Sequence, residues 1–129
     1  MVLLVSDMHF GRGPDERDRA TEEALLACLE YHLDELDELV LLGDVFDHYI
    51  EYEHLVPKGA PRLKGRLAEW TENGLAVSYL VGNHDPWHRD YFTRSLGVEV
   101  TDGATRRRPR PVLVLTVASD GPRYAVSEL

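Results

Sequence analysis

Three short apolar runs of the chain each end in polar side chains of the kinds that bind metal ions. The first run leads into Asp7-Met8-His9, the second into Gly43-Asp44-Val45-Phe46-Asp47, and the third into Gly82-Asn83-His84-Asp85. Carboxylate, amide and imidazole groups without a thiolate suit borderline divalent ions such as manganese, iron(II) or zinc. A carboxylate shared by two such ions is the centre of a two-metal hydrolytic site. The three clusters therefore indicate metal-dependent hydrolysis.

Each cluster taken alone has a plainer interpretation. Asp7 or Asp44 would more often be a turn or helix-capping residue, and His9 a hydrogen-bonded structural histidine. The same kind of cluster after three successive apolar runs favours a metal site over these alternatives. The remaining histidines have no comparable partners and are expected to be structural or surface residues: His32, His48, His54 and His88.

The segments between the clusters predict the elements that must position them. Short apolar runs predict strands, and apolar residues spaced by three or four predict helices. Strands are expected at residues 2–5, 39–42, 77–81, 98–100 and 112–117, and helices at 15–32, 62–72 and 89–96. This alternation predicts an α/β fold with a mostly parallel central sheet flanked by helices. Ligands of such sheets bind beyond the carboxyl ends of the strands, so Asp7, His9, Asp44 and Asn83 are expected to converge there.

The spacing within the first two helical segments also predicts which side chains face the core. In the first helix the residues expected there are Ala20, Ala24, Cys28 and Tyr31. In the second helix they are Leu63, Leu67 and Trp70.

Composition limits the other possibilities. The 129 residues are enough for a single domain, residues 1–129, with a hydrophobic core. The single cysteine excludes an intrachain disulfide and a cysteine-based zinc site. A net charge of −9 argues against general nucleic-acid binding, which depends on neutralising phosphates. No apolar run approaches the roughly 20 residues of a membrane-spanning helix and no signal-peptide pattern opens the chain, so an intracellular protein is expected.

A local cluster of arginines stands against this acidic background: Arg106, Arg107, Arg108 and Arg110. It is expected to be a solvated loop, with contact to a phosphate or an anionic membrane surface as the alternative.

The motifs D-x-H, G-D-x-x-D and G-N-H-D together resemble the signature of the calcineurin-like metallophosphoesterases. The connecting sequence is similar to the UDP-2,3-diacylglucosamine pyrophosphatases of lipid A synthesis, and this likeness covers about residues 1–100. The segments that carry it are residues 41–47, 51–53, 56–59, 82–87, 90–92 and 96–98.

The resemblance implies a role for each matching residue. Asp7 and His9 would bind the first ion, Asp44 would bridge two ions, and Asn83 would bind the second through its amide oxygen. His84 would stand beside the leaving group with its orientation fixed by Asp85, while Asp47 would orient a ligand. Manganese is the expected metal, with iron(II) or zinc as alternatives, and the ions would supply a hydroxide for attack on phosphorus.

The chain also departs from the family pattern. The family completes its site with histidines from a second half, including a G-H-x-H motif, but no histidine follows His88. We therefore expect a partial version of the fold in which residues 101–129 diverge from or replace the second half. Asp44 and Asn83 alone are too few ligands for a second ion, so the chain by itself is expected to hold at most one ion weakly and to hydrolyse little.

The connector between the second strand and the second helix predicts a lipid-facing or acyl-accepting surface. Its apolar residues are Tyr49, Ile50, Tyr52, Leu55 and Val56, and Lys58 and Arg62 would bind a diphosphate or anionic headgroups. The leading hypothesis is thus a phosphoesterase acting on a UDP-linked acylated sugar, in the cytoplasm or peripherally at the inner membrane. The alternatives are a metallophosphoesterase for nucleotides or phosphodiesters, and a non-catalytic remnant or interaction module.

Overall fold

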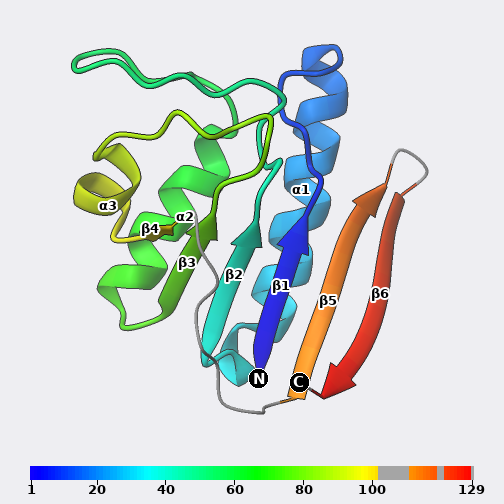
Figure 1. The fold of residues 1–129 in the computed structure, drawn as a ribbon. Coiled ribbons are helices and arrows are strands. Elements are labelled where there is room, and N and C mark those ends of the chain that lie inside the picture. The colour runs from blue at the N-terminus through cyan, green and yellow to red at the C-terminus, as the bar shows by residue number, and fades with distance from the viewer. Residues whose placement is uncertain (102–110, 119–120, 129) are drawn as a thin grey trace.

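A computed structural model describes residues 1–101, 111–118 and 121–128. Its centre is a six-stranded sheet in the order β4-β3-β2-β1-β5-β6 (Figure 1). The strands are β1 (Val2–Ser6), β2 (Glu38–Leu42), β3 (Ala76–Leu80), β4 (Glu99–Thr101), β5 (Pro111–Ala118) and β6 (Gly121–Glu128). The helices are α1 (Asp15–His32), a short 3₁₀ turn at Leu33–Glu35, α2 (Pro61–Glu72) and α3 (Tyr91–Leu96).

The direction of the strands confirms the predicted α/β fold with a mostly parallel sheet. Strand β1 pairs in parallel with β2 and β5, β2 with β3, and β3 with β4. Strand β6 runs antiparallel to β5 at the edge of the sheet. None of the helices in the described part of the chain is long and apolar enough to cross a membrane.

The order of the strands places the helices on one side of the sheet. From β1 to β4 each new strand is added on the same side of the one before it. Parallel crossovers are almost always right-handed, so successive helices in such a series cover the same face. Figure 1 shows α1 and α2 together behind the sheet. The carboxyl ends of β1, β2 and β3 consequently share one edge, where the loops that follow them lie side by side.

The core lies between this face of the sheet and the helices. Leu3, Leu39 and Val77 of the sheet pack in one buried cluster with Leu25 and Leu29 of α1. The residues expected from α2 are buried as predicted: Leu63, Leu67 and Trp70.

The prediction for the buried face of α1 was wrong. Tyr31 is 84% exposed, Ala20 and Ala24 are also exposed, and Cys28 is only partly buried. The buried stripe is formed instead by Glu22, Leu25, Leu26 and Leu29. Leucines bury more apolar area than alanines, so they determine which face turns inward.

A buried glutamate joins α1 to the start of α2. The Glu22 carboxylate accepts hydrogen bonds from the backbone N–H groups of Arg62 and Leu63 at 3.0 and 3.1 Å. These are two of the four amide groups that a helix leaves unpaired at its N-terminus. Ala60, directly before α2, supplies no side-chain cap, so a residue distant in sequence does so. The joint fixes the point at which the chain returns from the connector to the core.

We predict that Glu22→Ala lowers the free energy of unfolding by about 1–3 kcal/mol, because it leaves the amides of Arg62 and Leu63, the second of them buried, without an acceptor. Urea denaturation would measure the change. Glu30→Ala is the matched control, since Glu30 forms a half-exposed ion pair with Arg66 on the same two helices. This control should change stability by no more than about 1 kcal/mol. Equal effects of both substitutions would contradict the capping role.

Candidate metal centre

The loops that follow β1 and β2 continue the parallel pairing of the strands. The backbone N–H of His9 donates to the Asp44 carbonyl at 2.9 Å, and that of Phe10 donates to the Val45 carbonyl at 2.9 Å. The backbone N–H of Asp47 in turn donates to the Phe10 carbonyl at 3.0 Å. These bonds hold the D-x-H and G-D-x-x-D segments against each other at the carboxyl edge of the sheet.

Three candidate ligands have backbone conformations that L-amino acids rarely adopt. Asp7, His9 and Asp44 have φ angles of 62°, 49° and 49°. Among the described non-glycine residues only Ala60 shares this left-handed region. Such conformations cost about 1–3 kcal/mol each and concentrate at functional sites. Three of the four residues predicted from the sequence as metal ligands are thus among the strained ones.

The strained backbone brings these side chains together. Each of Asp7, His9 and Asp44 offers one ligand atom, and the three atoms lie within 4.8 Å of one another. The nearest Asp7–His9 approach is 3.7 Å, between a carboxylate oxygen and the imidazole Nε2. Met8, between them in sequence, is fully buried and anchors the loop. Two carboxylates and an imidazole are a donor set that suits a divalent ion.

Two glycines allow the second and third loops to approach each other. A Cβ atom on Gly43 would lie 2.8 Å from the Gly82 Cα, and one on Gly82 would lie 2.4 Å from an oxygen of the Asp44 carboxylate. Gly43 also has a φ of 74°. Any side chain at either position would separate the loops, so the glycines of the G-D and G-N-H motifs are required by packing.

Asn83 lies directly beside Asp44. The atom of its amide group that faces Asp44 lies 3.2 Å from both carboxylate oxygens. If that atom is nitrogen, the amide donates to both oxygens. If it is oxygen, three acceptor atoms face one another without a donor, so the amide is assigned with its nitrogen toward Asp44. Asn83 thus lies next to the carboxylate with which the resemblance pairs it.

Asp85 has partners other than the one expected from the resemblance. Its carboxylate is fully buried, and it accepts backbone N–H bonds from Gly82, Asp44 and Val45 at 2.8, 3.2 and 2.9 Å. The hydroxyl of buried Tyr79 donates to it as well, and together with burial this raises the pKa of Tyr79. Asp85 thus joins the second and third loops, and the orientation of His84 comes from elsewhere.

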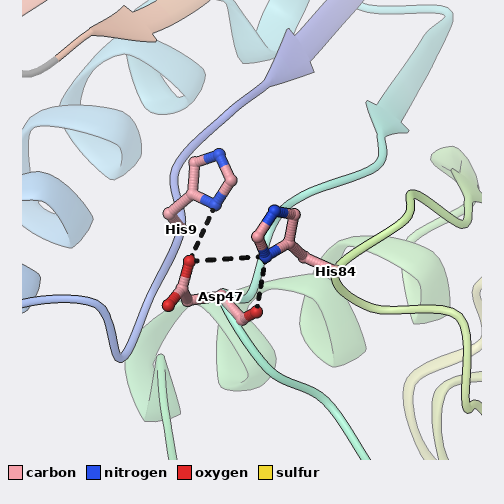
Figure 2. Close-up of side chains that lie close together, drawn as sticks. All are labelled: His9, Asp47 and His84. Atoms are coloured by element: carbon pink, nitrogen blue, oxygen red, sulfur yellow. Dashed lines mark hydrogen bonds and ion pairs between the residues drawn. The ribbon is translucent and has the colours of Figure 1, made fainter.

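Asp47 lies between the two histidines of the centre (Figure 2). Its Oδ1 atom is 3.2 Å from His9 Nδ1 and 3.6 Å from His84 Nδ1. His84 Nδ1 is also 3.0 Å from the Asp47 carbonyl oxygen. Because the Asp47 carbonyl oxygen can only accept, His84 Nδ1 is assigned as the protonated nitrogen, and His84 Nε2 is left as an acceptor. His9 Nδ1 is buried and forms no hydrogen bond within the described part of the chain, although Asp47 Oδ1 lies near it.

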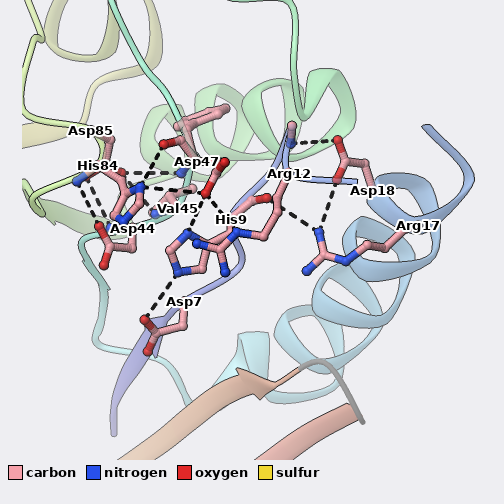
Figure 3. A network of polar contacts seen from close by, with 12 residues as sticks. Asp7, His9, Arg12, Arg17, Asp18, Asp44, Val45, Asp47, His84 and Asp85 are labelled. Carbon is pink, nitrogen blue, oxygen red and sulfur yellow. Dashed lines mark hydrogen bonds and ion pairs between the residues drawn. The ribbon is translucent and has the colours of Figure 1, made fainter. Parts of the chain in front are cut away.

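The same carboxylate oxygen also contacts the guanidinium of Arg12, a residue that the sequence analysis did not single out. Arg12 Nε donates to Asp47 Oδ1 at 2.9 Å (Figure 3). Partial burial raises the pKa of Asp47, but Arg12 and the nearby His48 and His84 rings outweigh it and hold the pKa below its ordinary value. Asp47, His9 and His84 are also close enough to hold an ion. The guanidinium on the same oxygen opposes this, so we interpret Asp47 as an orienting residue.

The two predicted substrate-binding cations lie away from these loops. The Arg62 guanidinium is 3.4 Å from the Glu22 carboxylate at the joint of α1 and α2. Lys58 lines a groove of about 440 Å³ with Val56, Lys64, Tyr91 and Leu96 among its other residues. The Arg106–Arg110 cluster lies outside the described residues.

Comparison with known proteins agrees with this geometry. The sequence model of the calcineurin-like phosphoesterase family matches residues 1–119. The chain therefore belongs to this family of metal-dependent phosphoesterases.

One relative with a described activity is UDP-2,3-diacylglucosamine hydrolase of Porphyromonas gingivalis (strain ATCC BAA-308 / W83). It is 35% identical over 99 residues, which are 77% of this chain and 38% of that relative. The present chain thus matches well under half the length of the relative.

We predict that Gly82→Ala lowers manganese affinity at least about tenfold, because the new methyl group displaces the Asp44 carboxylate. Calorimetric titration would measure the affinity. Gly65→Ala is the control, since a Cβ at this position in α2 meets no atom within 4 Å. It should leave the affinity unchanged and add up to about 1 kcal/mol of stability. Unchanged affinity in Gly82→Ala would contradict the packing argument.

Proposed function

We propose that the chain provides the first-half ligand set of a manganese-dependent phosphoesterase that cleaves the diphosphate of a UDP-linked acylated sugar. The observation that carries the proposal is the convergence of Asp7, His9 and Asp44 in strained conformations at one point. The likeness to UDP-2,3-diacylglucosamine hydrolase supports this choice of substrate.

The proposed roles follow from the contacts of each residue. Asp7, His9 and Asp44 would hold one ion, and Asp44 and Asn83 a second. Bound metal would activate water for attack on phosphorus and neutralise charge on the phosphate. Asp47 Oδ1 lies 3.2 Å from His9 Nδ1, where it would accept a hydrogen bond once His9 turns Nε2 to the ion. His84 stands beside the leaving group, where it would stabilise charge or transfer a proton at Nε2. Asp85 holds the Asp44 backbone in place.

The second ion has few ligands among the described residues. Asp44 would be shared, and Asn83 is a neutral ligand, so this ion would be held weakly. A partner chain that supplies histidines would complete the centre. The alternatives remain a metallophosphoesterase acting on nucleotides or phosphodiesters, and an interaction module that retains one metal.

Manganese titration of the 129-residue chain tests the proposal. We expect at most one weak site, abolished by Asp44→Asn, and slow or no release of UMP from UDP-2,3-diacylglucosamine. Glu23→Gln, on the exposed face of α1, is the control. Manganese binding that survives Asp44→Asn would refute the proposed metal centre. Two tight manganese sites with rapid turnover would refute the argument that the chain lacks ligands for a second ion. Faster cleavage of a chromogenic phosphodiester than of UDP-2,3-diacylglucosamine would favour the first alternative.

The connector supports peripheral contact of the protein with a membrane on its cytoplasmic side. Of the five apolar residues named from the sequence, Tyr49 is buried, but Leu55 is 70% exposed and Ile50 and Tyr52 are also exposed. Trp87, 56% exposed, adjoins Ile50 through an isolated parallel bridge. The adjacent groove lined by Val56 and Lys58 would accept part of an acyl chain. Clustered exposed apolar side chains mark interaction surfaces.

We predict that the protein binds sedimenting phosphatidylglycerol vesicles and that Leu55→Ser weakens this binding several-fold, because it removes the most exposed apolar side chain of the connector. Co-sedimentation would measure the bound fraction. Tyr31→Ser is the control, since Tyr31 is even more exposed than Leu55 but lies on α1. Equal losses in both variants, or none in either, would count against a lipid-facing connector.

A further inference from the structure

Arg12 occupies an unusual position on the loop after β1. Its backbone N–H donates to the His9 carbonyl at 3.1 Å, which closes a turn over the candidate ligand. The preceding Gly11 N–H donates to Asp18 of α1 at 2.8 Å. The loop is therefore fixed at both its ligand end and its helix end, and Arg12 is held close to the metal centre.

The Arg12 side chain is fixed through one nitrogen and free at the others. Nε donates to Asp47 Oδ1 at 2.9 Å, the same oxygen that faces His9 and His84 (Figure 3). The side chain is 51% exposed, and within the described part of the chain no bond to its terminal amino groups is found. Two parallel N–H donors on a planar cation match the oxygens of a phosphoryl group.

Other cations near the loop are less suited to this task. Arg17 reaches toward Asp18 and the His9 carbonyl, each at 3.5 Å. Arg62 pairs with Glu22 at the joint between α1 and α2. Arg12, and not Arg62, therefore lies beside the carboxylates and imidazoles of the candidate centre.

We propose that Arg12 is a phosphate-binding residue, oriented by Asp47 and presenting its two terminal amino groups to a phosphoryl group that lies beside His84. This proposal rests on the proposed function in one respect, because the phosphoryl group would belong to the substrate proposed there. The binding of the anion itself does not require turnover. Asp47 contacts Arg12 through its carboxylate and His84 through its backbone carbonyl. The bound phosphoryl group and the imidazole would therefore keep a fixed relation to each other.

Titration with inorganic phosphate, followed by ³¹P nuclear magnetic resonance, tests this proposal. Mg²⁺ would be the diamagnetic metal in one series, and a chelator would replace it in a second. We expect Arg12→Gln to weaken phosphate binding at least about tenfold in the Mg²⁺ series. Arg12→Lys should fall between it and the wild type, because it keeps the charge but loses the paired donors. Arg19→Gln is the control, since Arg19 pairs with Glu23 on the exposed face of α1.

A manganese titration of the same variants separates anion binding from metal positioning. Unchanged manganese affinity with weakened phosphate binding supports the proposal. Phosphate binding that is absent in the wild type, unchanged in Arg12→Gln, or weakened only as much as metal binding overturns it. Manganese binding that survives Asp44→Asn, while phosphate still binds through Arg12, would count against the proposed function alone.

Discussion

The buried carboxylate of Asp85 is the interaction on which the rest of the centre depends. A fully buried charge is tolerated only where hydrogen bonds replace its hydration. Here the donors are backbone N–H groups of two different loops together with the Tyr79 hydroxyl. Satisfying this carboxylate therefore requires that the two loops meet. Their meeting brings Asp44 beside Asn83, and the glycines at positions 43 and 82 make it sterically possible.

The sheet below the loops imposes the second constraint. Parallel strands added in one direction bring three strand ends to a common edge, so the side chains of residues 7, 44 and 83 meet although they are distant in sequence. This alignment of the strand ends is stabilised by the helices, by the joint at Glu22 and by the core between the helices and the sheet. The polar chemistry at the edge is thus supported by an ordinary hydrophobic layer behind it.

Much of this arrangement could be predicted from the sequence because its signals are local. Apolar runs such as Leu39–Leu42 indicate strands, and their alternation with helices implies a shared edge. The buried face of α1 was missed because spacing alone allowed two stripes, and only the volume of the leucines chose between them. The partners of Asp85 and Arg12 depend on contacts between separate loops, as with Glu22 and the start of α2. No local pattern in the chain encodes such contacts.

The left-handed backbone at Asp7, His9 and Asp44 has a consequence for how such a chain can change over evolutionary time. Aspartate and asparagine tolerate this conformation better than most residues, whereas β-branched side chains do not. Most substitutions of these residues would increase backbone strain, even in a protein that no longer needed catalysis. Relaxation of the loops, by contrast, would gain stability but separate the three side chains. The strained backbone of the centre therefore lowers the stability of the protein, and selection for metal binding would be needed to maintain it.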